Sequence, residues 1–217
     1  DIEMKYRALG NTGLRVSEVS FGSYGFDNPT LLLAALDVGI NFFDTANVYG
    51  GKRGEGVTEQ IVGRWLAQGG GRRDAVVLAT KVYNPVRRKA NLSEVNSDGA
   101  SLSAYKIRKH CEGSLRRLQT DYIDLYMVHW PITTHPIAGS FAVLQDLKAE
   151  GKIRSIGVSN FSPNIWMLSC KRRRSCPPST KLNSTPATGS RRSPVSPRSW
   201  VSWSNPGRPL PGATYSE

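Results

Sequence analysis

The sequence predicts an α/β fold and favours a (β/α)8 TIM-type barrel that is incomplete in this chain. Short β-branched runs alternate with amphipathic stretches through residues 5–160, which is the pattern of consecutive βαβ units. No G-x-G-x-x-G motif follows the first strand, which weakens the alternative of an open, doubly wound sheet. Polar side chains end several predicted strands, at the face where barrel enzymes assemble their sites. These side chains are Asp44, Lys81, His129 and the pair Ser159-Asn160.

The first part of the chain is predicted to contain a hairpin, three strands and two helices. The turn residues Gly10-Asn11 separate Lys5–Leu9 from Thr12–Val16, which indicates a small hairpin. Helix Glu59–Gln68 has apolar side chains on one face and ends at three consecutive glycines. Strand Ala75–Val82 is nearly all apolar, as expected of a strand buried on both faces. The remaining elements are a strand at Val16–Gly22, a short helix at Leu31–Val38 and a strand at Ile40–Thr45.

Two further strand and helix pairs complete the pattern, which gives five β/α units after the hairpin. Ser103 starts a long helix, and its predicted buried stripe includes Ile107, Cys111, Leu115 and Leu118. The elements that follow are a strand at Tyr122–His129, a helix at Ser140–Glu150 closed by Gly151, and a strand at Ile153–Ser159.

The C-terminal segment differs from the rest of the chain in composition. The formal net charge of the chain is +12, of which residues 1–170 contribute +4 (20 basic, 16 acidic) and residues 171–217 contribute +8 (9 basic, 1 acidic). The same 47 residues hold 8 of the 13 prolines and show no strand or helix period. We therefore predict a folded domain over residues 1–166 and a disordered basic tail over residues 167–217.

Composition excludes several classes of protein. No run of about 18 apolar residues exists, so no membrane span or membrane partner is expected. No signal peptide is expected, because residues 1–9 lack an apolar stretch behind a positive start. Three cysteines do not make a disulfide scaffold, so a cytoplasmic location is the default expectation.

Four side chains form a set that suits the protonation of a carbonyl group while another group delivers a hydride. They are Asp44, Tyr49, Lys81 and His129. A phenol is a poor acid at neutral pH, and an ammonium close to it lowers its pKa. A carboxylate can hold that ammonium in place, and a histidine can orient the carbonyl oxygen that receives the proton. This chemistry needs no metal.

Each of the four residues also has a structural alternative. Asp44 could cap the turn that follows its strand, and Tyr49 could be an ordinary loop tyrosine. His129 could be a core histidine with satisfied hydrogen bonds. Lys81 is harder to explain in this way, because a lysine that closes an apolar strand needs a partner. Four such residues at strand ends are an improbable coincidence, so we favour the catalytic interpretation.

Five segments resemble the aldo-keto reductase superfamily. They are K-Y-R-A-L-G-N-T-G-L-R-V-S (5–17), N-F-F-D-T-A-N-V-Y-G (41–50), A-T-K-V (79–82), S-L-R-R-L-Q-T-D-Y-I-D-L-Y-M-V-H-W (114–130) and I-G-V-S-N-F (156–161). The V-Y-G-G and G-R-W-L segments are most similar to bacterial general oxidoreductases and to potassium-channel β-subunit-like members. The resemblance covers roughly residues 4–166, so it ends where the predicted tail begins.

The resemblance implies a role for each matching residue. Tyr49 would be the general acid, Lys81 would tune it, Asp44 would pair with Lys81, and His129 would orient the substrate carbonyl. The positions that would contact the cofactor are Gly22, Ser23, Asp44, Ser159 and Asn160, of which the last two match residues that hold the nicotinamide carboxamide. Tyr24 and Trp130 would line the substrate pocket.

The function that the resemblance implies is reduction of aldehydes or ketones to alcohols with NADPH, or sometimes NADH. Because the later barrel strands and cofactor-binding loops are missing, we expect this activity and NADPH binding to be impaired in the 217-residue chain. The partner would then be a small-molecule carbonyl substrate. One alternative is a non-catalytic, nucleotide-binding regulatory subunit similar to the channel β-subunits, which keep the same four residues. A second alternative is a basic nucleic-acid-binding protein, whose DNA affinity would depend on salt and on residues 171–217.

The tail suggests a shifted reading frame, which removes most of the weight of the nucleic-acid alternative. Codons permitted for Ser179–Gly189, regrouped one base earlier, give V-N-Q-V-E-L-H-P-G-Y-W, similar to the family's sixth strand. Ser193–Gly212 regroups to L-A-R-F-A-A-K-L-G-I-V-V-E-S-W-T-P-L-A-R, similar to the next helix and the seventh strand. We therefore hypothesise a one-base frameshift between about Ser162 and Ser169 and expect no nucleic-acid partner. A DNA sequence without an insertion or deletion in that interval would refute the frameshift.

Overall fold

A parallel β-sheet organises the computed structural model, which describes residues 3–50, 53–82, 102–131, 137–161, 179–183 and 200–204. The sheet order is β3-β4-β5-β6-β7-β9-β8, and every neighbouring pair is parallel. The strands are β3 (Ser20–Gly22), β4 (Phe42–Asp44), β5 (Val77–Val82), β6 (Ile123–Val128), β7 (Ile153–Ser159), β8 (Ser179–Asn183) and β9 (Trp200–Ser204). The first five strands follow the chain order, as in an incomplete α/β barrel.

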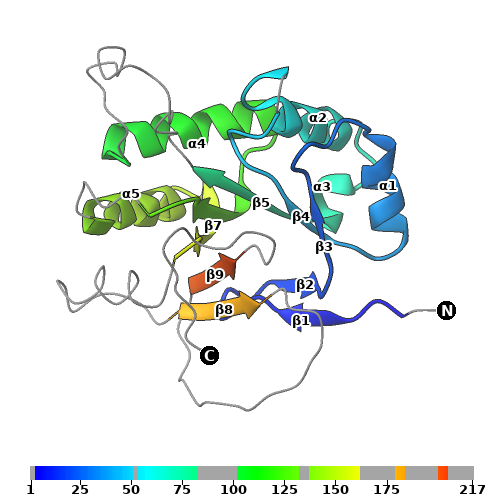
Figure 1. The fold of residues 1–217 in the computed structure, drawn as a ribbon, viewed down its shortest axis with the longest axis horizontal. Helices are drawn as coiled ribbons and strands as arrows, with labels where there is room; N and C mark the ends of the chain where they lie inside the picture. The colour runs from blue at the N-terminus through cyan, green and yellow to red at the C-terminus, as the bar shows by residue number, and fades with distance from the viewer. Residues whose placement is uncertain are drawn as a thin grey trace, which may run out of the picture.

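The helices connect these strands and lie on one side of the sheet (Figure 1). They are α1 (Thr30–Asp37), α2 (Val57–Leu66), α3 (Arg72–Ala75), α4 (Ala104–Leu118) and α5 (Ile137–Ala149). Helix α4 begins where the sequence predicted, because the Ser103 side chain accepts a hydrogen bond from the backbone N–H of Lys106. The four-residue helix α3 was not predicted. No helix in the described part of the chain is long and apolar enough to cross a membrane.

The sheet has an apolar core on each of its two faces. Alternate residues of a strand point to opposite faces, so Tyr126 and Val128 of β6 pack against the helices while Leu125 and Met127 face the other way. The hairpin of β1 (Tyr6–Ala8) and β2 (Arg15–Ser17) covers this second face. Leu9, which follows β1, and Val16 of β2 pack there against inward-facing residues of β4, β5 and β6. The hairpin therefore makes an apolar floor beneath the inner face.

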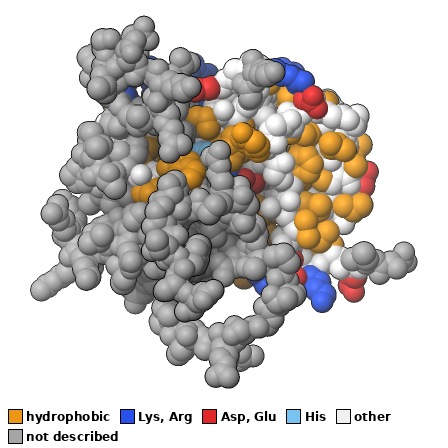
Figure 2. Space-filling view, viewed as in Figure 1, with side chains coloured by type: hydrophobic (Ala, Val, Ile, Leu, Met, Phe, Trp, Pro, Cys, Tyr) orange, Lys and Arg blue, Asp and Glu red, His pale blue; other side chains and the backbone are white. Residues whose placement is uncertain are grey.

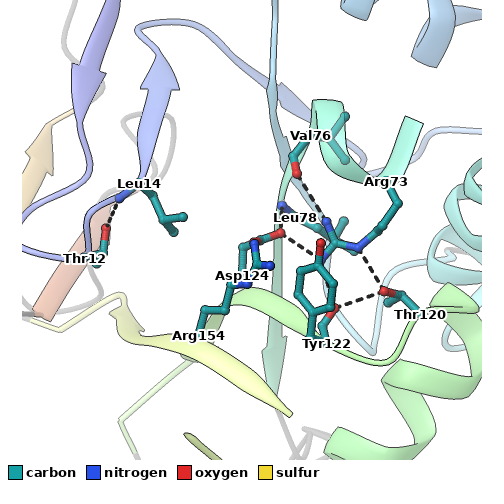
Figure 3. A network of polar contacts seen from close by, with 9 residues as sticks. All are labelled: Thr12, Leu14, Arg73, Val76, Leu78, Thr120, Tyr122, Asp124 and Arg154. Atoms are coloured by element: carbon teal, nitrogen blue, oxygen red, sulfur yellow. Dashed lines mark hydrogen bonds and ion pairs between the residues drawn. The ribbon is translucent and has the colours of Figure 1, made fainter. Parts of the chain in front are cut away.

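A buried carboxylate ties together the amino-terminal ends of three strands (Figure 3). Asp124 of β6 is 1% exposed, accepts hydrogen bonds from the backbone N–H of Leu78 and from Arg154, and forms an ion pair with Arg73, each at 2.9 Å. The two guanidinium groups lie 3.8 and 3.9 Å from the centre of the Tyr122 ring. Because the Asp124 carboxylate is paired with two cations and hydrogen-bonded, it can remain buried and fix β5, β6 and β7 relative to one another.

The predicted strand Val16–Gly22 is divided in the structure. Val16 belongs to the hairpin strand β2, and only Ser20–Gly22 join the parallel sheet as β3. The break occurs at Ser17, whose N–H donates to the side-chain oxygen of Asn41 (2.7 Å) and whose hydroxyl donates to the Val19 carbonyl (2.6 Å). These two bonds turn the chain from the hairpin into the sheet.

The prediction of a tail without regular structure is wrong for two segments. Strand β9 pairs with β7, and β8 pairs with β9, so both strands extend the parallel sheet. Without β9, the backbone N–H and C=O groups on one edge of β7 would be unpaired. The segments W-V-S-W-S and S-T-K-L-N contain aromatic and β-branched residues that suit strands. The rest of the predicted disordered tail (167–178, 184–199 and 205–217) lies outside the described residues.

Candidate active site

The strand period places the predicted residues on one face of the sheet. Each of the four strand-end residues comes two positions after a residue that faces inward, so it shares that face. The pairs are Phe42 and Asp44, Ala79 and Lys81, Met127 and His129, and Gly157 and Ser159. Because the strands are parallel, their carboxyl ends meet at the same edge, above the apolar floor. The predicted site residues are therefore brought together there.

Lys81 is the centre of this cluster. Its side chain is fully buried, and Nζ lies 2.6 Å from Asp44 Oδ2, 3.0 Å from the Thr45 carbonyl oxygen and 3.2 Å from the Tyr49 hydroxyl. An ammonium group has three N–H donors, and these three acceptors match them. Burial raises the pKa of Asp44, and the neighbouring Lys81 ammonium offsets part of that increase. The Thr45 carbonyl is a contact that the sequence did not predict.

Tyr49 is half-buried, and its ring centre lies 4.8 Å from Lys81 Nζ. Burial raises the pKa of the phenol above its ordinary value, and the Lys81 ammonium acts in the opposite direction. The sequence predicted that Lys81 would lower this pKa. Its influence has that sign, but burial is the larger effect, so the net direction is upward. The phenol consequently stays protonated at neutral pH and remains able to donate a proton.

His129 stands beside the phenol as a neutral imidazole. Its ring centre is 5.8 Å from that of Tyr49, and the residue is 8% exposed. Burial and the Lys81 ammonium lower its pKa to about 3. A neutral imidazole has one N–H donor. His129 can therefore hydrogen-bond to an oxygen next to Tyr49 without adding a charge to the site.

The predicted cofactor positions surround the same edge. Asn160 has a left-handed backbone (φ 60°), and its side-chain amide donates to the His129 carbonyl (2.9 Å) and to Ser159 Oγ (3.0 Å). Ser23 follows β3, and its N–H donates to the Asp44 carbonyl (2.9 Å). A Cβ added at Gly22 would meet no atom within 4 Å. Among the described residues, Ser23 Oγ and Asp44 Oδ1 are buried polar atoms without a hydrogen-bond partner, as expected where a polar ligand binds.

Aromatic side chains extend the site on both sides of Tyr49 and His129. The Tyr24 ring meets the Tyr49 ring edge-on at 5.3 Å and is 83% exposed. The Trp130 ring is stacked 6.2 Å from that of His129. Figure 2 shows a histidine between hydrophobic side chains near the centre of one face of the molecule. Tyr24 and Trp130 therefore lie beside Tyr49 and His129 respectively.

The low pKa of His129 predicts a loss of stability in acid. An unfolded chain binds the histidine proton near pH 6.5, whereas the folded chain binds it only near pH 3. Within this window the unfolded state holds more protons, so the free energy of unfolding falls as the pH falls. His129→Gln should reduce this acid-dependent loss, by on the order of 4 kcal/mol at the acid end. Urea unfolding across the window measures the effect, and equal pH slopes for the variant and the parent chain would contradict it.

The chain is similar to known oxidoreductases. The chain matches the model of the aldo/keto reductase family over residues 27–190. It is 46% identical over 166 residues to the uncharacterized oxidoreductase YrpG of Bacillus subtilis (strain 168), which covers 73% of this chain and 50% of that protein. It is 38% identical over 170 residues to a 6-dehydroglucose reductase of Novosphingobium aromaticivorans, with 72% and 52% covered.

A solved structure is similar as well. The aldo-keto reductase AKR11C1 from Bacillus halodurans, in its holo form, superposes with a TM-score of 0.65 at 37% sequence identity, over 82% of this chain and 57% of that one. The chain spans about half the length of the curated relatives that it matches. The family match covers most of its residues, and we conclude that the chain belongs to the aldo/keto reductase family.

Proposed function

We propose that this protein reduces an aldehyde or ketone to an alcohol with NADPH, and that Tyr49 is the general acid. The observation that carries the proposal is the position of Lys81 Nζ, which contacts both Asp44 Oδ2 and the Tyr49 hydroxyl from a fully buried site. A buried lysine that contacts a phenol and a carboxylate at strand ends of a barrel is typical of a catalytic group rather than of a structural ion pair.

The proposed chemistry divides between the bound nicotinamide and the side chains. A reduced nicotinamide, when bound, supplies a hydride to the carbonyl carbon. Tyr49 donates its hydroxyl proton to the carbonyl oxygen, and the Lys81 ammonium stabilises the phenolate that remains. Neutral His129 donates a hydrogen bond to the same oxygen and orients it. Tyr49 recovers a proton from solvent, so the net products are the alcohol and the oxidised nucleotide.

The described residues fit the polar groups of a nicotinamide nucleoside. Ser23 Oγ and Asp44 Oδ1 are buried polar atoms that can bind ribose hydroxyls. Ser159 and Asn160 adjoin His129 and would hold the carboxamide, and Gly22 leaves room above the backbone. The choice of NADPH over NADH follows from the family resemblance.

Turnover of a generic aldehyde tests the proposal. We expect the 217-residue chain, mixed with NADPH and 4-nitrobenzaldehyde, to consume NADPH at a rate proportional to protein concentration. The change in NADPH fluorescence on mixing measures binding separately. Binding without turnover would favour the regulatory, nucleotide-binding alternative. Absence of both, in a chain shown to be folded by circular dichroism, would overturn the proposal for this chain.

A further inference from the structure

We propose that Thr58 of α2 and His110 of α4 are positioning residues for the loop that carries Tyr49. This inference rests on the proposed role of Tyr49. Neither residue was identified from the sequence. Thr58 lies nine residues after Tyr49, and His110 reaches the loop from α4, 63 residues from its partner Asn47. Their contacts hold the loop from its outer side, whereas Lys81 holds it from the inner side.

The loop between Asp44 and Tyr49 wraps around Lys81. The Thr45 carbonyl accepts from Lys81 Nζ (3.0 Å), and the Asn47 N–H donates to the Lys81 carbonyl (3.2 Å). The Tyr49 N–H donates to the Ala46 carbonyl (3.0 Å), which closes a turn. These bonds fix the beginning and the middle of the loop, and the end of the loop depends on contacts from elsewhere.

Thr58 supplies the contact at the end of the loop. Both its N–H and its hydroxyl lie 3.4 Å from the Tyr49 carbonyl oxygen. The hydroxyl also lies 3.0 Å from Thr45 Oγ1, and the two threonines are 0% and 1% exposed. A continuous chain of donors results if Thr45 donates to Thr58 and Thr58 donates to the carbonyl. One buried hydroxyl therefore links both ends of the loop.

His110 supplies a contact in the middle of the loop. Its Nδ1 lies 3.3 Å from the side-chain nitrogen of Asn47, which is 6% exposed. Burial lowers the pKa of His110, and so do the nearby positive charges of Arg117, Lys106 and Lys109. The ring is therefore neutral, and a neutral Nδ1 can accept a hydrogen bond from the Asn47 amide.

The two helices share a rigid base with the strand that carries Lys81. A Cβ at Gly63 of α2 would lie 2.0 Å from the carbonyl oxygen of Arg117 in α4, so the helices touch through their backbones. Glu59 is fully buried and accepts from Arg117 Nε (2.7 Å) and from the Thr80 hydroxyl (2.6 Å). Since Thr80 precedes Lys81, the loop contacts and the lysine extend from one connected unit.

Loss of these contacts should be visible at the Tyr49 phenol itself. The titratable or charged groups that act on it are Lys81 on β5, Asp44 on β4 and Tyr24 after β3, and the His129 ring lies beside it. Burial is the largest influence and raises the pKa of Tyr49. If the loop is released toward solvent, the Tyr49 phenol becomes less buried and also loses its contact with the Lys81 ammonium. The pKa should then fall toward the value of an ordinary tyrosine.

The test is an NMR titration of the full 217-residue chain with a carbon-13 label at tyrosine Cζ. The Tyr49 signal is assigned by its disappearance in Tyr49→Phe. We expect Thr58→Val and His110→Leu each to lower the Tyr49 pKa, the double variant to lower it further, and Thr58→Ser to keep the parent value. Where turnover is measurable, kcat should fall about tenfold in Thr58→Val with KM little changed.

Thr120→Val is the matched control. Its hydroxyl donates to the Tyr122 carbonyl and accepts from Arg73 at the other end of the strands, so its loss should leave the Tyr49 pKa unchanged. An unchanged Tyr49 pKa in folded Thr58→Val and His110→Leu would overturn the inference, and so would an equal change in Thr120→Val. If Thr58→Val does not fold, His110→Leu decides alone. The titration needs neither cofactor nor turnover, so its result is separate from the failure of the proposed function.

Discussion

Tyr49→Phe should lower kcat for carbonyl reduction by about 10²–10⁴-fold, the usual contribution of a general acid. The hydroxyl is the only part of the side chain that is removed, and it is the group 3.2 Å from Lys81 Nζ. The ring remains, so its edge-on contact with Tyr24 at 5.3 Å should be preserved. NADPH fluorescence should therefore show unchanged nucleotide affinity, while steady-state kinetics show the loss in kcat.

Tyr105→Phe is the matched control for this prediction. It removes a hydroxyl from a tyrosine on α4 that is 65% exposed, and its kinetics should equal those of the parent chain. A Tyr49→Phe variant that keeps the parent kcat would eliminate Tyr49 as the general acid. A variant that loses nucleotide binding to the same degree as kcat would instead assign Tyr49 to the binding of the nucleotide.

The fold and the juxtaposition of the site residues could be predicted because both depend on local periodicity. Alternation along a strand assigns Lys81 to the face of Ala79, and parallel pairing brings the carboxyl ends of adjacent strands to one edge. The helices at Leu31–Val38 and Glu59–Gln68 were predicted from apolar spacing, and α1 and α2 confirm them within a few residues. The catalytic and binding roles of the site residues remain predictions.

The features that sequence analysis missed depend on contacts between distant segments. The pKa of Tyr49 is raised because the effect of burial exceeds the opposing effect of the Lys81 ammonium. The extent of burial is decided by the assembled fold. Thr58 and His110 reach the loop from two helices, and His110 lies 63 residues from its partner Asn47. Strand β3 is shortened because Ser17 pairs with Asn41, a contact that no local pattern indicates.

Strands β8 and β9 bear on the frameshift hypothesis without testing it. Ser179–Asn183 and Trp200–Ser204 lie inside the two segments whose regrouped codons give strand-like sequences. A barrel that follows chain order would place β8 beside β7, whereas here β9 lies between them. The strands thus coincide in sequence position with the regrouped strands but differ from them in sheet order.

Lys81→Met should abolish carbonyl reduction and destabilise the fold at neutral pH by about 3–5 kcal/mol, the cost of leaving one member of a buried ion pair without its partner. Methionine fills similar space, but Asp44, which is 5% exposed, then lacks the cation at 2.6 Å. Urea unfolding at neutral pH measures the loss of stability, and steady-state kinetics measure the loss of turnover.

The pH dependence of the Lys81→Met variant separates this electrostatic cost from a loss of packing. Without the ammonium, the folded-state pKa of Asp44 rises further above its unfolded value, so the folded state binds the extra proton. The stability of the variant relative to the parent should then improve as the pH falls and worsen as it rises. Adding Asp44→Asn should restore most of the stability at neutral pH without restoring turnover, because the amide carries no charge to neutralise. A deficit that is independent of pH and persists in the double variant would mean that Lys81 acts through packing alone.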